Sequence, residues 1–114
     1  MFRSLLFSAV LCTLPFAAAA DQLTGQEAFE VLTAATRTYS GGSVSTFRPD
    51  GTFVFTHADG RREEGTYRIT QRGLVQVNDA THGSNYTFVV SERGGQYFFT
   101  YRSGPGRGNT YSFE

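Results

Sequence analysis

The part of the chain from Val44 to Phe113 alternates apolar and polar residues in short runs, which glycines interrupt. Side chains on a β-strand point alternately to its two faces, so this alternation predicts strands with one buried face. Two of the interruptions contain Asp-Gly, a pair that tolerates the left-handed backbone of a tight hairpin. Since no interruption is long enough for a helical crossover, we expect antiparallel pairing. The expected strands are Val44–Arg48, Thr52–His57, Arg62–Thr70, Leu74–Asn78, Asn85–Glu92, Gln96–Arg102 and Thr110–Phe113.

The same alternation assigns side chains to a core. We expect the face with most of the aromatic residues to be buried, because these side chains bring the largest apolar area. The opposite face is mainly polar, with Val54, Val89 and Phe98 as apolar exceptions. A meander of about seven strands can curl into a half-barrel or form a strongly twisted sheet, either of which partly covers a second face. The expected inward residues are Phe53, Phe55, Tyr67, Ile69, Val75, Val77, Tyr86, Phe88, Val90, Tyr97, Phe99 and Tyr101.

One helix is expected before the strands. Thr24 and Glu27 have the spacing of a capping box, in which the side chain of each residue bonds the backbone N–H of the other. The apolar residues that follow recur at helical spacing, so we expect a helix from about Gly25 to Thr36 with one apolar stripe. The fold class is therefore mainly β (α+β), with one N-terminal helix packed on an antiparallel meander. The stripe consists of Leu23, Ala28, Val31, Leu32 and Ala35.

Residues 1–20 have the three-part pattern of a secretory signal peptide. Arg3 gives a positive start, residues 4–14 form an apolar run, and small residues lead to a cleavage point expected between Ala20 and Asp21. The apolar run is shorter than the roughly 20 residues that span a bilayer. An N-terminal membrane anchor is the alternative. We expect a periplasmic or secreted protein with no membrane span after cleavage.

Cys12 is the only cysteine of the chain. A lipoprotein would carry its lipid there, but that processing needs a small residue before the cysteine and Leu11 is large. Cleavage leaves one β-rich domain, residues 21–114, without thiols or disulfides, which excludes thiol catalysis and cysteine zinc sites. Basic and acidic residues number 10 each, so no basic field attracts nucleic acid. We expect no nucleic-acid partner and no cofactor.

The densest group of ionisable side chains comprises His57, Asp59, Glu63 and Glu64. His57 and Asp59 flank a predicted hairpin turn, and the two glutamates begin the returning strand. Imidazoles and carboxylates are ligands of zinc and related metals, so the hairpin could assemble a metal site. The group also fits a solvated hairpin tip. We favour the tip, because one histidine with three flexible carboxylates is a weak zinc set.

Asp79, His82 and Ser84 contain the residue types of a Ser/His/Asp catalytic arrangement within one polar turn. Base and nucleophile normally come from separate elements, and residues this close in one loop rarely reach the required geometry. We therefore expect a non-enzymatic protein.

Tyrosines provide a further candidate site, a pocket inside the curled sheet. A buried tyrosine hydroxyl needs a hydrogen-bond partner, and a bound ligand can supply one. A cavity with tyrosine at its mouth could hold a small apolar or aromatic ligand, whereas ordinary core packing is the alternative. The candidate binding residues are Tyr67, Tyr86, Tyr97 and Tyr101, with Tyr111 as a further ring and Arg68 on the outer face.

Three motifs follow one another between Val44 and Asn78, namely Phe47-x-x-Asp50-Gly51-Thr52, Asp59-Gly60 and Gly65-Thr66-Tyr67-Arg68-Ile69. With the predicted signal peptide, this order resembles short periplasmic bacterial β-meander proteins of unknown function. The resemblance implies an optional helix followed by a meander, and it implies no activity. Many of those proteins have tryptophan where this chain has Tyr67, and a later cysteine pair that is absent here.

These observations favour an exported binding module for a small ligand or an envelope partner. The alternative is a protein-interaction role, such as inhibition of a hydrolase, through exposed hairpin loops. A metal-dependent enzyme is a third class. A pocket deep in the curled sheet, lined by Tyr97 and Tyr101, would favour the first class, and a flat aromatic patch the second. The third requires His57 and carboxylates to converge around one point.

Overall fold

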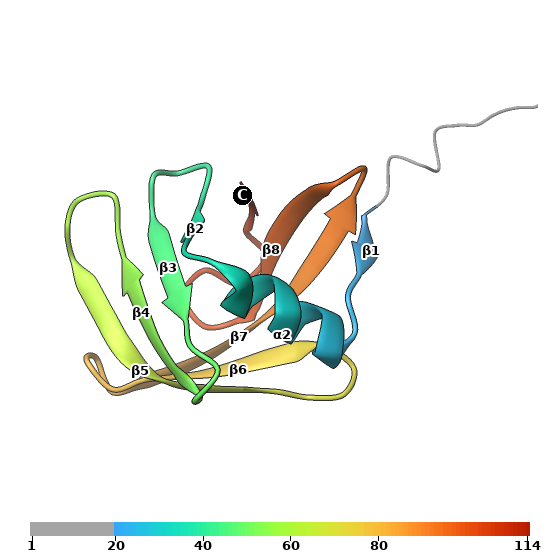
Figure 1. Ribbon diagram of the computed structural model, residues 1–114. Coiled ribbons are helices and arrows are strands. Elements are labelled where there is room, and N and C mark those ends of the chain that lie inside the picture. The colour runs from blue at the N-terminus through green and yellow to red at the C-terminus, as the bar shows by residue number, and fades with distance from the viewer. Residues whose placement is uncertain (1–19) are drawn as a thin grey trace, which may run out of the picture.

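The computed structural model describes residues 20–114 (Figure 1). The predicted signal peptide and Cys12 lie outside the described residues, apart from Ala20 at the expected cleavage point. Within residues 20–114, no helix has the length and apolar character needed to cross a membrane.

The described chain forms one helix and nine strands, and every strand pair is antiparallel. The seven predicted strands correspond to β3 to β9. The sequence prediction missed β1 and β2, which have only two residues each. Strands β2 to β9 pair in chain order, and β1 pairs with β7. The elements are β1 (Asp21–Gln22), α2 (Gly25–Ala34), β2 (Arg37–Thr38), β3 (Val44–Phe47), β4 (Thr52–Thr56), β5 (Arg62–Ile69), β6 (Leu74–Asp79), β7 (Ser84–Arg93), β8 (Gln96–Ser103) and β9 (Thr110–Phe113).

The first and last strands of the meander meet, so the sheet is nearly closed and barrel-like rather than a half-barrel. The N–H of Thr38 donates to the carbonyl of Glu114 over 3.2 Å, and the N–H of Glu114 donates to the carbonyl of Thr38 over 3.1 Å. The N–H of Ser40 donates to the carbonyl of Ser112 over 2.8 Å. We call this junction the seam. Figure 1 shows the sheet curling round from β3 to β8.

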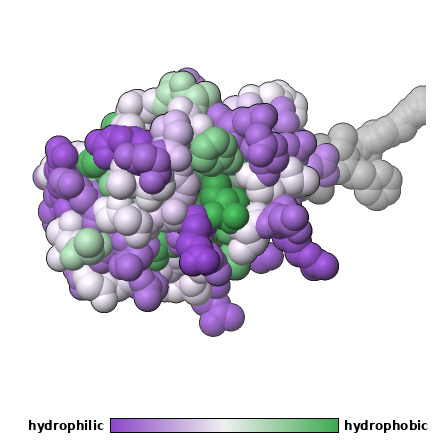
Figure 2. Space-filling model, turned by 60° about the horizontal axis from the view of Figure 1, so that its bottom comes forward, coloured by the Kyte–Doolittle hydropathy of each residue, from purple (hydrophilic) through white to green (hydrophobic). Residues whose placement is uncertain are grey.

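Aromatic rings fill the inside of the curled sheet. Phe88 and Phe99 stack with their centroids 3.7 Å apart and are almost fully buried. The predicted inward face is confirmed, and Tyr39, Phe47 and Phe113 also belong to the core. The outer face is mostly hydrophilic, with a small apolar patch in the view of Figure 2. The predicted inward residues that are buried are Phe53, Phe55, Tyr67, Val75, Val77, Phe88, Val90 and Phe99, while Ile69, Tyr86, Tyr97 and Tyr101 are half-buried against them.

Helix α2 begins at the predicted capping box. The N–H of Glu27 donates to the hydroxyl of Thr24, and the N–H of Thr24 donates to the carboxylate of Glu27 over 2.9 Å. The helix ends at Ala34, two residues before the predicted end. The Arg37 guanidinium donates from Nε and Nη2 to the carbonyl of Val31 over 2.9 and 2.6 Å. This satisfies a carbonyl that the end of the helix leaves without an intrahelical partner.

The helix covers one end of the curled sheet, which we call the helix end. The N–H of Gly25 donates to the carbonyl of Gln71 over 2.9 Å, and a Cβ on Gly25 would collide with the carbonyl oxygen of Thr70. The side chains of Ala28 and Leu32 lie in the core. The start of α2 and the β5–β6 turn therefore touch through their backbones, and only glycine at position 25 permits so close an approach.

Candidate functional site

The other end of the curled sheet is open, and a cavity of about 680 Å³ lies there. In an antiparallel meander, every second connection returns to the same end. The cavity is accordingly lined by residues from four connections, β2–β3, β4–β5, β6–β7 and β8–β9, and by the strands below them. No residue of α2 lines it. In Figure 1 the β4–β5 and β6–β7 connections lie on the left, away from β1.

Six aromatic rings line this cavity. The centroids of Tyr86 and Tyr101 are 5.6 Å apart, and Tyr101 meets Tyr111 edge to face at 6.3 Å. Such spacings are those of mutually attractive aromatic pairs. The rings form a continuous apolar wall between the core and the mouth of the cavity. They belong to Tyr39, Phe55, Tyr86, Phe99, Tyr101 and Tyr111.

The tyrosine hydroxyls in this wall differ in their hydrogen bonds. The hydroxyl of Tyr39 lies 2.7 Å from that of Ser45, deep in the core. Within residues 20–114, the hydroxyls of Tyr86 and Tyr101 have no hydrogen-bond partner. Burial, with the nearby charge of Glu63, raises the pKa of Tyr101 to about 12. Burial also raises the pKa of Tyr86, so both phenols are neutral donors at ordinary pH.

Two histidine–carboxylate pairs stand at the mouth of the cavity. The first joins Nε2 of His57, at the end of β4, to Oε2 of Glu63 on β5 over 2.5 Å. The pairing of Phe55 with Glu63 and of Thr56 with Arg62 sets this register across the hairpin. The ring of His57 also packs edge to face on Phe55 at 5.1 Å, which fixes its position over the aromatic wall.

The second pair joins Nδ1 of His82 to Oδ2 of Asp79 over 2.8 Å. Asp79 ends β6 and is only 2% exposed. Its Oδ1 accepts from the N–H groups of Thr81 and His82 over 3.0 and 3.2 Å. Burial alone would raise the pKa of Asp79, but the hydrogen bonds from His82 and Thr81 outweigh it and hold that pKa below its usual range.

The two pairs meet through Glu63, which lies close to Asp79 and His82. One carboxylate oxygen of Glu63, one of Asp79 and one ring nitrogen of His82 lie within 4.8 Å of one another, and His57 contacts Glu63. Strands β5 and β6 are neighbours, which brings Glu63 beside Asp79 although 16 positions separate them in the sequence. We call His57, Glu63, Asp79 and His82 the mouth cluster.

This cluster is neither of the two groups that the sequence suggested. Asp59 and Glu64 are not part of it, because each forms an exposed ion pair, with Arg61 at 2.8 Å and with Arg62 at 2.9 Å, although Asp59 also lines the cavity. Ser84 lines the cavity. Among residues 20–114, no hydrogen bond joins Ser84 to His82, so the nucleophile–base contact of a catalytic triad is missing here.

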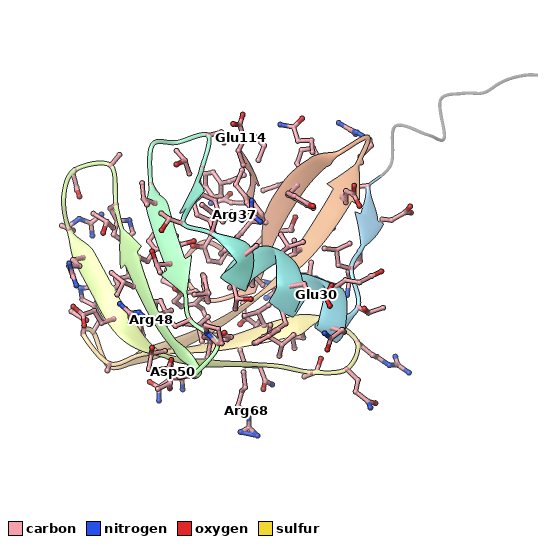
Figure 3. The ribbon with its side chains drawn as sticks, in the orientation of Figure 1. Glu30, Arg37, Arg48, Asp50, Arg68 and Glu114 are labelled. Atoms are coloured by element: carbon pink, nitrogen blue, oxygen red, sulfur yellow. The ribbon has the colours of Figure 1, made fainter. Side chains whose placement is uncertain are left out.

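The structure separates the predicted binding residues. Tyr86 and Tyr101 line the open-end cavity, whereas Tyr67 and Arg68 border a second hollow, of about 830 Å³, beside the start of α2. The hydroxyl of Tyr67 donates to the carbonyl of Arg48 over 2.6 Å, which occupies it. In Figure 3 the side chain of Arg68 extends away from the sheet.

Tyr97 lies near the seam, outside the lining of both hollows. It stacks on Phe113 with the centroids 5.6 Å apart, and the Arg37 guanidinium lies 5.6 Å from its ring centroid. Tyr97 therefore packs against Phe113 and Arg37 near the C-terminus of α2.

Comparison of the chain with protein-family models, with curated proteins and with solved structures gives no match. The resemblance to periplasmic β-meander proteins therefore stays a prediction.

Proposed function

We propose that this protein is an exported, non-enzymatic binding module that takes a small ligand into the cavity at its open end. The observation that carries the proposal is the cavity itself, about 680 Å³ in volume and walled by six aromatic rings. Sites for small organic ligands typically have about 300–1,000 Å³ and a mainly apolar lining with a few polar groups.

The polar groups in the wall indicate what kind of ligand fits. Tyr86 and Tyr101 offer phenol O–H groups that no neighbour among residues 20–114 uses. Because their pKa values are raised, these phenols stay protonated and donate. We therefore propose a ligand with an aromatic or apolar body and a hydrogen-bond acceptor, such as a carbonyl or ether oxygen, on its inner end.

The concave shape of this site supports a small ligand over a protein partner. Binding of an envelope protein, or inhibition of a hydrolase, would use the same four connections as a surface. A flat aromatic patch would support that role, but only Tyr111 among the large hydrophobic residues of the described chain is exposed, at 37%.

A fragment screen by two-dimensional ¹H–¹⁵N NMR tests the proposal. We expect neutral aromatic amides and ethers to shift the backbone amides of Tyr86, Phe99 and Tyr101. Replacing both phenols, Tyr86→Phe with Tyr101→Phe, keeps the rings and removes two hydrogen bonds of about 1 kcal/mol each, so affinity should fall about thirtyfold.

The matched control is Tyr97→Phe, which removes a phenol outside the cavity and should leave affinity unchanged. The proposal fails if no fragment binds, or if the shifts gather around Tyr67 and Arg68 instead.

A further inference from the structure

The mouth cluster contains more donor groups than the small-ligand proposal uses. His57, Glu63, Asp79 and His82 come from the β4–β5 hairpin and the β6–β7 turn, and all four line the open-end cavity. Three of them place a donor atom within 4.8 Å of one another, and the fourth is 2.5 Å from Glu63. The exposed side chain of His82 connects the cluster to solvent at the mouth of the cavity.

The carboxylates of the cluster have no direct arginine partner among residues 20–114, although Arg61 lines the same cavity and its charge acts on Glu63 from a distance. Among residues 20–114, no arginine forms an ion pair with Glu63 or Asp79, because Arg61 pairs with Asp59 and Arg62 pairs with Glu64. Two carboxylates thus face two imidazoles in a partly buried place. Such a set favours a bound cation, since the ion places positive charge directly beside both carboxylates.

The residue types point to a transition-metal ion rather than calcium or magnesium. Calcium and magnesium take oxygen ligands almost alone, whereas imidazole with carboxylate suits zinc and its neighbours. The Nδ1 of His82 already bonds Asp79 over 2.8 Å. A carboxylate that holds a histidine in this way fixes the ring orientation in many metal sites.

We propose that the mouth cluster binds one divalent transition-metal ion, with zinc as the best match. Glu63, Asp79 and His82 supply the three ligand atoms, and His57 orients Glu63 through their 2.5 Å contact. Ligand atoms around a tetrahedral zinc ion are about 3.3 Å apart, so the side chains must draw together slightly. The imidazole of His82 can follow, because its side chain is 49% exposed.

Isothermal titration calorimetry of the purified protein with zinc chloride, after removal of metals by a chelator, tests this site. We expect one zinc ion to bind per chain. A separate titration with calcium chloride under the same conditions should show no saturable binding. His82→Ala and Glu63→Gln should each weaken zinc binding at least tenfold. Circular dichroism before each titration verifies that the variants are folded.

Glu64→Gln is the matched control, because Glu64 is the next residue on the same strand and lies outside the cluster. Its zinc affinity should equal that of the wild type. The proposal is overturned if the folded wild type shows no saturable zinc binding, if Glu63→Gln leaves the affinity unchanged, or if Glu64→Gln lowers it equally. The titration contains no organic ligand, so its result is independent of the fragment screen.

Discussion

The helix end and the open end of this curled sheet are built from the same meander, yet they have opposite chemistry. At the helix end, Gly25 lies against the backbone of the β5–β6 turn and Leu32 completes the core. At the open end, a cavity is lined by the mouth cluster and by phenols that have no hydrogen-bond partner among residues 20–114. The difference teaches that one short helix can add its apolar side chains to the core at one end of the sheet, while the other end keeps a cavity lined by aromatic and ionisable side chains.

The largest effect should come from the helix end. Leu32→Ala removes a fully buried side chain and should lower the free energy of unfolding by about 3 kcal/mol. Tyr111→Ala, at the open end, should cost less than about 1 kcal/mol because its ring is exposed. Urea denaturation measures both. Equal losses would show that the open end contributes to the core as much as the helix end does.

A smaller effect should separate two tyrosines within the cavity wall. Tyr39→Phe removes a buried hydrogen bond and leaves Ser45 without its partner, at a cost of about 1–2 kcal/mol. Tyr86→Phe removes a hydroxyl that has no partner among the described residues, so the free energy of unfolding should change by less than about 0.5 kcal/mol. A comparable loss of unfolding free energy in both variants would mean that the Tyr86 hydroxyl already forms a hydrogen bond in the folded protein.

The smallest effect concerns one proton at the mouth. The pKa of Asp79 is lower in the folded protein than its usual value of about 4 in the unfolded chain. The ionised carboxylate therefore stabilises the fold fully above about pH 4, and this stabilisation is lost as the pH falls through the folded-state pKa. The difference in unfolding free energy between wild type and Asp79→Asn should therefore narrow between about pH 5 and about pH 2. A constant difference would show that the carboxylate charge has no role.

Local patterns in the sequence predict much of this fold. The Thr24–Glu27 spacing marks the start of the helix, and the Asp-Gly pairs and alternation predict the strands from β3 to β9. The short strand β2 carries no such pattern, because two residues are too few for alternation. Its hydrogen bonds with Glu114, directly after β9, depend on the curvature of the whole sheet, which no local stretch encodes.

The candidate site was harder to predict, for a related reason. Alternation assigns a side chain to a face of the sheet, but it does not say toward which end of the curled sheet that side chain lies. Tyr67 and Tyr86 share the inner face, yet Tyr67 lies beside the helix and Tyr86 at the open end. The mouth cluster likewise needs the register that sets β5 beside β6 before Glu63 can approach Asp79.

The seam has a kinetic consequence. It pairs Thr38 with Glu114, so its formation closes a loop that contains every strand from β3 to β9. Every hairpin joins residues much closer in sequence and loses less chain entropy on closing. We therefore expect the hairpins to form first and the seam to form last, once the curl of the sheet has brought the two edges together. Until that moment both edge strands expose unpaired backbone groups, the usual starting point for aggregation of a β protein.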